Sequence, residues 1–232
     1  MTSTAHIPYH TTERTIDRND PNIRTLKGLL SAFMTHPSPQ ILAGITVTSL
    51  GARIAIGSWA AQDAVIAATI AAWWPIQETI FHRCILHARP FTVFGTTIDV
   101  GKFHREHHQH PRDLNGFIPL KLFYGAPLIG LGLSRLVLGN WPRALTAFTV
   151  WFGLAFNYEW SHFFVHAPYA PRTRWGQRLK KDHLLHHFHN ETFWWEVSTP
   201  GLFDRLLMKI RGFPFWSTAK DIPHSATTHT VF

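Results

Sequence analysis

The sequence predicts an all-α integral membrane protein, in which four transmembrane helices form two hairpins beneath a cytoplasmic helical cap. Three observations support this fold class. Four apolar stretches each approach the ~20 residues that a helix needs to cross a bilayer. The links within the first pair and within the second pair are short, as between antiparallel neighbouring helices. Ten histidines form four spaced clusters, which fall at or beyond the ends of these stretches.

The four predicted spans are not uniformly apolar. They cover residues 40–60, 64–81, 117–138 and 141–163. Arg53 lies inside the first span, where its side chain would either reach outward to the membrane surface or face the interior of the bundle. Lys121 and Arg135 lie near the ends of the third span, from which long basic side chains can reach water. The alternative is a soluble helical protein in which these helices are buried.

Composition and charge give the orientation. The chain has 232 residues, of which 45% are hydrophobic, a single cysteine and a formal net charge of +8. Lys and Arg concentrate in the N-terminal, central and C-terminal segments, so the positive-inside rule places these segments and both termini in the cytoplasm. Because the charge follows the topology and no recognition motif is present, nucleic acid is not an expected partner. The single cysteine excludes an intramolecular disulfide framework.

We expect a single membrane domain over residues 1–232. Its parts are a cytoplasmic N-terminal segment (1–39), the four spans with a cytoplasmic central segment (40–163, with 82–116 in the cytoplasm), a cytoplasmic cap (164–216) and a mobile tail (217–232). Residues 21–34 have the pattern of a short amphipathic helix. That helix would lie either on the membrane surface or in the cytosol.

The histidine clusters are the strongest functional signal. They are His82 and His87; His104, His107 and His108; His162 and His166; and His183, His186 and His187. Side chains three and four residues apart share one face of a helix, so each HxxHH triplet and the HxxxH pair would project its rings together. In the HxxxxH pair the side chains lie about 140° apart around an α-helix. That pair therefore reaches one site only if the helix ends or distorts between the two residues.

Ten imidazoles exceed the ligand set of one zinc ion, which binds about four groups. Sites of this kind, with few carboxylates, suit iron, zinc or copper. The sequence has no HExxH motif, and one cysteine cannot build a cysteine-based zinc site. We interpret His6, His10, His36, His224 and His229 as ordinary surface or core histidines. Candidates for hydrogen bonds that orient the ligands are His110, His189, Glu106 and Glu159.

The residues in and around the clusters resemble the membrane-bound fatty acid hydroxylase superfamily, which includes sterol desaturases. The fatty acid 2-hydroxylase branch is the most similar. That branch carries HxxxxH, HxxHH, HxxxH and HxxHH in this order, and all ten positions are filled here. The resemblance covers about residues 78–207. Its flanking matches are residues 157–163 and 107–113, Leu179-Lys180 before His183, Phe188 after His187, Ser198-Thr199, and Leu202-Phe203-Asp204.

This resemblance implies a dimetal centre of two iron ions, held by the ten histidines, with zinc as a possible substitute in a purified protein. It implies oxygen-dependent hydroxylation of a C–H bond in a lipid or acyl chain, with dioxygen as co-substrate. The sequence contains no fused haem-binding electron carrier, so we expect a separate ferredoxin- or cytochrome-type donor. We expect a compact member of the family in a bacterial inner membrane.

Two other readings stay open at this point. A sterol or carotenoid desaturase or hydroxylase of the same superfamily would have nearly the same ligand pattern. A membrane metal transporter or metal-binding protein belongs to a different class. Transporters place polar ligands near the bilayer midplane, whereas the interiors of these spans contain no histidine. A hydrolytic zinc enzyme would not need ten imidazoles.

Overall fold

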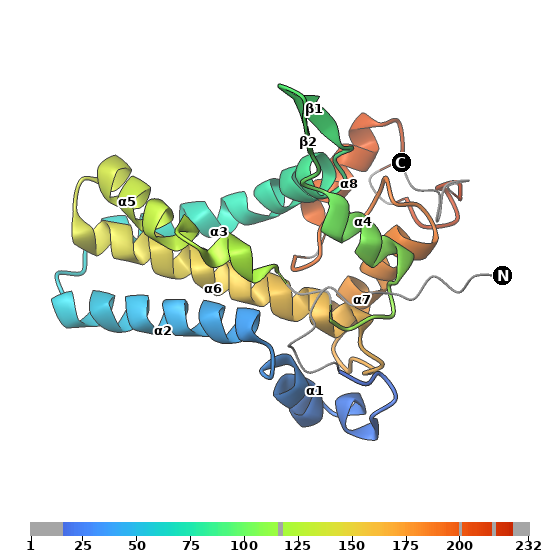
Figure 1. Ribbon diagram of the computed structural model, residues 1–232, viewed down its shortest axis with the longest axis horizontal. Helices are drawn as coiled ribbons and strands as arrows, with labels where there is room; N and C mark the ends of the chain where they lie inside the picture. The colour runs from blue at the N-terminus through green and yellow to red at the C-terminus, as the bar shows by residue number, and fades with distance from the viewer. Residues whose placement is uncertain (1–15, 116–117, 200, 215–216, 225–232) are drawn as a thin grey trace.

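The computed structural model describes residues 16–115, 118–199, 201–214 and 217–224. This part of the chain is mainly helical and contains eight α-helices and one β-hairpin (Figure 1). The helices are α1 (Leu26–Phe33), α2 (Pro37–Ile56), α3 (Ala61–Phe81), α4 (Lys102–Gln109), α5 (Ala126–Leu138), α6 (Trp141–His166), α7 (Arg174–Phe188) and α8 (Leu202–Ile210). The hairpin pairs β1 (Phe91–Val93) with β2 (Thr96–Ile98) in antiparallel register.

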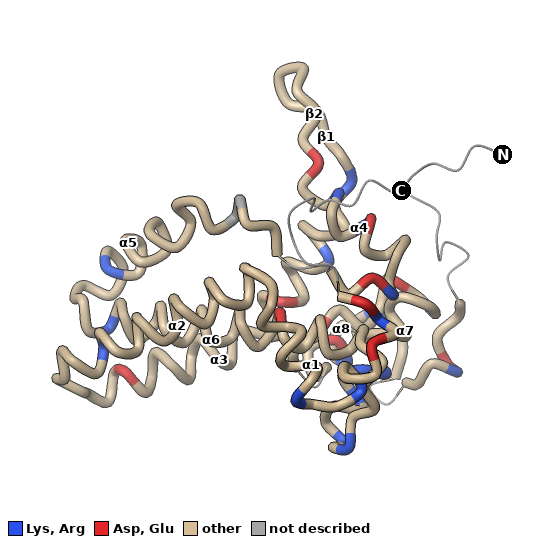
Figure 2. Tube along the Cα trace, turned by 60° about the horizontal axis from the view of Figure 1, so that its bottom comes forward, with Lys and Arg blue, Asp and Glu red and all other residues tan. Residues whose placement is uncertain are grey.

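The molecule has two ends. At one end α2, α3 and α5 pack around the central helix α6, and all four run roughly along the long axis of the molecule (Figure 1). At the other end α1, α4, α7 and α8 form a cap, into which α6 extends to meet α7. Figure 2 shows most of the charged residues at the cap end, while the bundle end carries few. The charge separation read from the sequence is therefore present in space.

Two helices are long and apolar enough to cross a membrane, rather than the four that we expected. They are Pro37–Ile56 and Ala61–Leu86, and only 22% and 17% of their most apolar windows are buried inside the molecule. The fourth predicted span coincides with α6, which is long enough but does not pass the same test of composition. Polar side chains such as Asn157, Glu159 and His162 interrupt its apolar sequence.

The prediction of a third span over residues 117–138 is wrong in its length. Residue 117 lies outside the described part, and a 3-10 turn (Leu120–Phe123) precedes a helix of 13 residues. Gly125 and Gly139, both in the left-handed conformation at φ 82° and φ 77°, flank this helix, and a proline occupies its first turn. These residues fix where α5 begins and ends, so the apolar run forms a helix too short to span.

Arg53, the weak point of the first predicted span, faces the interior of the bundle. Its side chain is 1% exposed and forms an ion pair with Asp63 at 2.9 Å. The guanidinium also donates to the hydroxyl of Thr146 at 2.9 Å and lies 3.8 Å from the ring centroid of Trp59. One charged pair therefore joins α2, α3 and α6 at the end of the bundle far from the cap.

The predicted helix over residues 21–34 is present, with a break at Thr25. Residues 21–34 form a 3-10 turn (Pro21–Arg24) and α1, separated by Thr25, whose hydroxyl accepts a hydrogen bond from the Gly28 amide at 3.1 Å. Helix α1 is amphipathic, because Leu29 and Phe33 are buried while Lys27 and Ser31 are exposed; Leu26 and Leu30 add apolar surface to its exposed side. Of the predicted tail (217–232), residues 217–224 are described, and Ile222 among them is buried; residues 225–232 lie outside the described part, and the mobility of the tail stays a prediction.

Candidate metal centre

Four pieces of the chain bring the ten clustered histidines together in the cap. Helix α4 carries His104, His107 and His108, and α7 carries His183, His186 and His187, as the HxxHH spacing predicted. The HxxxH pair, His162 and His166, lies in the last turns of α6. His82 begins a short segment after α3, and His87 ends it.

The HxxxxH pair meets the others through a π-helical turn. Residues His82–Leu86 form this turn, which the amide of His87 closes by donating to the carbonyl of His82 at 3.1 Å. A π-turn spaces its hydrogen bond over five residues instead of four. It therefore brings residues five apart back to nearly the same face. The expected distortion between the two histidines is confirmed, and the ring centroids of His82 and His87 lie 5.2 Å apart.

The histidines form two groups of five, and within each group the candidate ligand atoms lie within 4.8 Å of one another. The first group is His82, His87, His104, His108 and His186. The second group is His107, His162, His166, His183 and His187. Each i, i+4 pair stays in one group, whereas the middle histidine of each triplet, His107 or His186, joins the other group. Helices α4 and α7 thus contribute to both groups, and the rings of His108 and His187 stack between them at 4.0 Å.

The separations between ring nitrogens fit shared metal ions better than hydrogen bonds. His104 Nε2 lies 2.9 Å from His82 Nε2, 3.2 Å from His87 Nε2 and 3.1 Å from His108 Nε2. One ring nitrogen carries either a hydrogen or a lone pair, so it cannot form three such bonds at once. A metal–nitrogen distance of ~2.1 Å would hold neighbouring ligand nitrogens ~3.0 Å apart at a right angle.

The second group has the same geometry. His166 Nε2 lies 3.0 Å from His107 Nε2 and 2.9 Å from His183 Nε2, and His187 Nε2 lies 3.0 Å from His183 Nε2. His162 Nε2 is buried and has no hydrogen-bond partner among the described residues. A buried polar atom without a partner is costly, and a metal ion would satisfy a ring nitrogen in this position.

Burial keeps the imidazoles in the form that binds metals. Loss of solvent, and then repulsion from neighbouring imidazoles, lowers the pKa of His104, His108 and His187 well below the usual value. Burial also lowers the pKa of His107 to about 4. The rings are therefore neutral near pH 7, and each offers a lone pair to a metal.

Two carbonyl groups orient ligands of the first group. The Nδ1–H of His82 donates to the carbonyl of Trp195 at 2.6 Å, and the Nδ1–H of His186 donates to the carbonyl of Phe193 at 2.7 Å. With the proton on Nδ1, the lone pair stays on Nε2, which faces the other rings. The Trp195 ring itself packs against His82, His87 and His186 at centroid distances of 5.3, 4.9 and 5.0 Å.

Three buried acids hold the loop that supplies these carbonyls. Glu196 and Asp204 exchange backbone hydrogen bonds, since each carboxylate accepts from the other residue's amide at 2.8 Å. From α3, Glu78 accepts from the amides of Val197 and Ser198 and from the Ser198 hydroxyl. We did not predict a role for these acids, because a carboxylate that binds backbone amides has no characteristic sequence spacing.

Replacing Glu78 with Ala should weaken the first group selectively. The change leaves two buried amides without an acceptor, at a cost of ~1–3 kcal/mol for each group, and loosens the loop that carries the Trp195 carbonyl. Because loss of residues that orient ligands costs ~10–100-fold in metal affinity, we expect one of two bound metals to be lost first during dialysis against a chelator. Glu78→Gln keeps an acceptor oxygen and should retain more metal. Equal retention by wild type and Glu78→Ala would contradict this role.

The four predicted orienting residues have different surroundings. Glu159 accepts hydrogen bonds from the Ser38 hydroxyl at 2.7 Å and the Ile118 amide at 2.8 Å. His189 Nε2 pairs with the Ile222 carbonyl at 2.7 Å. Glu106 lies on α4 with one oxygen 3.9 Å from the Lys102 ammonium, and His110 is exposed at the end of α4. The orienting role of these residues stays a prediction.

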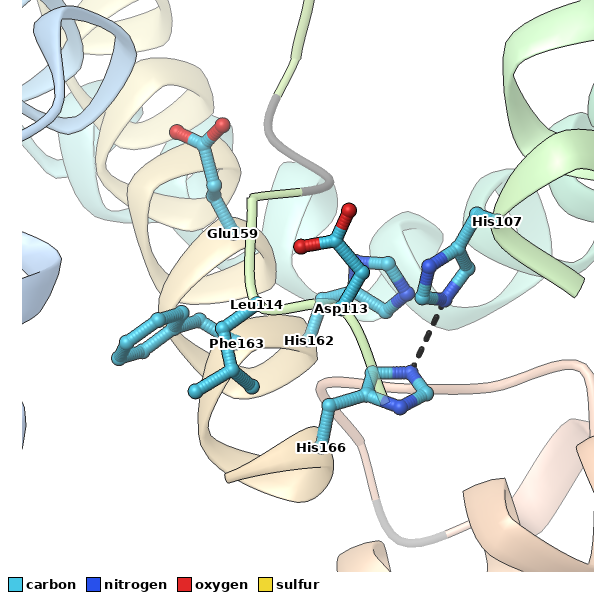
Figure 3. Close-up of a pocket in the computed structure, with 7 residues that line it drawn as sticks. All are labelled: His107, Asp113, Leu114, Glu159, His162, Phe163 and His166. Atoms are coloured by element: carbon cyan, nitrogen blue, oxygen red, sulfur yellow. Dashed lines mark hydrogen bonds between the residues drawn. The ribbon is translucent and has the colours of Figure 1, made fainter. Parts of the chain in front are cut away.

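A small cavity adjoins the second group. His107, His162 and His166 line one side, and Asp113, Leu114, Glu159 and Phe163 complete it. Figure 3 shows the three imidazoles turned toward one another, while the Glu159 carboxylate points away from them. Outside this cavity, Glu191 is an acid that we did not single out from sequence, and its carboxylate lies 4.0 Å from His108 Nδ1.

Comparison with protein-family models, curated proteins and solved structures finds no match for this chain. The assignment of a function therefore rests on the site and its surroundings. In the described part of the chain, the site is two adjacent groups of five neutral imidazoles, which could hold metal ions.

Proposed function

We propose that this chain is a membrane-bound di-iron hydroxylase that inserts an oxygen atom from dioxygen into a C–H bond of a lipid or acyl chain. The observation that carries the proposal is the pair of five-histidine groups at one end of a helical bundle. Two helices of that bundle are long and apolar, and most of their side chains are not buried inside the molecule. The donor of the two electrons is a separate ferredoxin- or cytochrome-type protein. The orientation, with both termini in the cytoplasm of a bacterial inner membrane, is part of the same proposal.

The donor set supports a pair of redox-active metals. Five neutral nitrogens in each group would suit a divalent first-row metal. Iron would supply the oxygen activation that attack on an unactivated C–H bond requires, whereas zinc has no redox chemistry. Zinc bound after purification would therefore be a substitute. The chain's own residues would hold two ions in adjacent groups, and they keep the imidazole rings neutral and buried.

The exposed apolar helices support a lipid environment. A soluble protein that contained two such helices would bury most of their surface. Here α2 and α3 expose large apolar side chains, including Val47, Ile54, Val65 and Trp73. Helix α5 is exposed in the same way at Leu128, Leu136 and Val137. These faces offer a surface for acyl chains along the bundle.

Metal transport is less well supported. A transporter holds its ion near the middle of the bilayer, between helices that can rearrange around it. Both histidine groups instead lie in the cap, where α4 and α7 supply six of the ten rings. The opposite end of the bundle contains the buried Arg53–Asp63 pair, which would repel a cation on the arginine side.

The test is incorporation of labelled oxygen. Membranes that contain the iron-loaded chain, with either a ferredoxin or a cytochrome b5-type donor and its reductase, are incubated under ¹⁸O₂, and their total lipids are analysed by mass spectrometry. We expect lipid species that gain one ¹⁸O with the iron protein and none with the zinc-loaded protein. A gain of a double bond without oxygen would favour the sterol or carotenoid desaturase alternative. If two irons are bound and no lipid changes with either donor, the proposal is wrong.

A further inference from the structure

The hairpin β1–β2 stands away from the remainder of the fold in both views of the molecule (Figures 1 and 2). All residues from Phe91 to Ile98 are exposed. The register pairs Phe91 with Ile98 and Val93 with Thr96, and it pairs Thr92 with Thr97. Opposite residues in an antiparallel pair share a face, and the faces alternate along the strand. The hairpin therefore has one mainly apolar face and one threonine face, with no charged residue in either strand or in the turn.

The tip of the hairpin is an exposed aromatic residue in a strained conformation. Phe94 is 104% exposed and has a φ of 47°, followed by Gly95 at 77°. Two successive positive φ values are those of a type I′ turn, for which Asn-Gly is the favoured pair. A bulky residue is unfavourable at the first position. Among the described residues, no packing offsets either the strain or the exposure of this ring, and such an outlier is typical of a functional contact.

The base of the hairpin is joined firmly to the metal-ligand elements. The Arg105 guanidinium lies on α4, next to His104, and contacts both oxygens of Asp99 at 2.6 Å. It also donates to the carbonyl of Ala88. A Cβ added at Gly101 would lie 2.5 Å from the Leu86 carbonyl oxygen, so only glycine permits this close approach. The base of the hairpin is therefore held against α4 and the π-helical turn.

The chain itself fixes where the hairpin lies. Strand β1 begins at Phe91, only a few residues after the candidate span Ala61–Leu86 ends. The pictures place the hairpin at the junction of bundle and cap, extending sideways from the long axis. Arg83, Arg89 and Lys102 flank it in sequence, and basic residues in this position attract anionic headgroups. An apolar face and tip beside the end of a span match the boundary between headgroups and acyl chains.

We propose that the β1–β2 hairpin inserts its apolar face and Phe94 into the surface of the lipid bilayer, and so sets the height of the metal centre above the acyl chains. The partner is the lipid surface itself. The proposal rests on the membrane embedding of α2 and α3, which is one part of the proposed function. It assigns a lipid contact to a segment outside both the spans and the histidine groups.

Fluorescent labels in nanodiscs test this contact. In a Cys84→Ser background, single cysteines replace Phe94 at the tip, Thr97 on the threonine face, and Val47 on α2, which is 68% exposed. Each full-length protein carries an environment-sensitive label and is placed in phosphatidylcholine and phosphatidylglycerol, with or without brominated acyl chains. We expect the lipid quencher to reduce the signal at position 94 at least ~2-fold more than at position 97, as for an interfacial apolar face. The label at position 47 should be quenched strongly.

The outcomes separate this inference from the proposed function. Quenching at position 47 without quenching at position 94 overturns the hairpin contact and leaves the spans in the membrane. No quenching at either position overturns both. A third outcome is that the label at position 94 changes its fluorescence only after the electron-donor protein is added. That result would assign the tip to that protein, and it would also overturn a lipid contact.

A second variant checks the turn without a label. Phe94→Asn creates the Asn-Gly pair that a type I′ turn favours, so the hairpin should fold at least as well. We compare the wild-type protein in nanodiscs with the same protein held in solution by an amphipathic polymer without lipid. We expect the backbone amide hydrogens of residues 91–98 to exchange more slowly in the nanodiscs. In the Phe94→Asn protein this lipid-dependent protection should be lost. Equal protection of both proteins in nanodiscs would contradict the role of Phe94.

Discussion

Alanine in place of His107 or His186 should abolish lipid oxidation and lower the bound iron from two ions toward one. The two residues belong to different groups, the second and the first respectively. Loss of residues that merely orient ligands costs ~10–100-fold in metal affinity or activity, so loss of a ligand should cost at least as much. Both variants should be inactive, because two-electron chemistry at a pair of metals requires both sites.

The measurement is metal content after gel filtration, together with the Mössbauer spectrum of ⁵⁷Fe-loaded protein. We expect the spectrum of two coupled ions in wild type and that of an isolated ion in each variant. The control is His229→Ala, a histidine outside the clusters and outside the described residues, which should keep both ions and full activity. Two irons and undiminished oxidation in His107→Ala would show that the ligand assignment is wrong.

Replacing Arg53 with Met should destabilise the bundle by ~3–5 kcal/mol, the usual cost of leaving one partner of a buried ion pair uncompensated. Arg53 and Asp63 have side chains that are 1% and 6% exposed. Without the guanidinium, the Asp63 carboxylate keeps only the Thr146 hydroxyl at 2.6 Å and the Ala60 amide at 2.9 Å. Those dipoles do not replace a full positive charge in a water-poor site.

The matched variant is Arg53→Met together with Asp63→Asn, which removes both charges and keeps an oxygen acceptor for the helix start. This double variant should recover most of the free energy of unfolding that Arg53→Met loses relative to wild type. The measurement is thermal or denaturant unfolding of all three proteins in the same detergent. Arg135→Met is the control for a basic residue near a helix end, where the guanidinium lies 5.7 Å from the Trp141 ring. Arg135 is half-buried and Trp141 is exposed, and a cation–π contact near the surface is worth only ~0.5–1 kcal/mol. A similar loss in Arg53→Met and Arg135→Met would contradict the ion-pair argument.

Local spacing predicted the local geometry of the histidines well. The HxxHH triplets lie on helices, and the HxxxxH pair lies on a distorted turn. Both features were predictable because they depend only on the number of residues per helical turn. The division into two groups could not be predicted in this way. Whether His107 faces the partners of His104 or those of His166 depends on the angles between α4, α6 and α7, which no single helix determines.

Other parts of the fold depend on features that hydropathy does not register. Glycine and proline at the ends of α5 shorten an apolar run that is long enough by composition. The β-hairpin follows from β-branched residues on both sides of Gly95, a sequence signal that is weaker than the adjacent histidine clusters. Glu78 binds backbone amides more than one hundred residues away in the sequence. Glu196 and Asp204 bind each other's amides within one loop. Only the tertiary structure brings these acids to the backbone amides that they bind.

The interleaving of the two groups across α4 and α7 constrains the order in which the chain can mature. Each group takes at least one ring from Arg174–Phe188, the last ligand-bearing helix to leave the ribosome. No complete set of five exists before that helix is made, although the other seven histidines of the two groups precede it in the chain. If the two groups hold metal ions, loading would be a late event that follows synthesis of the bundle and joins the N-terminal and C-terminal halves of the cap.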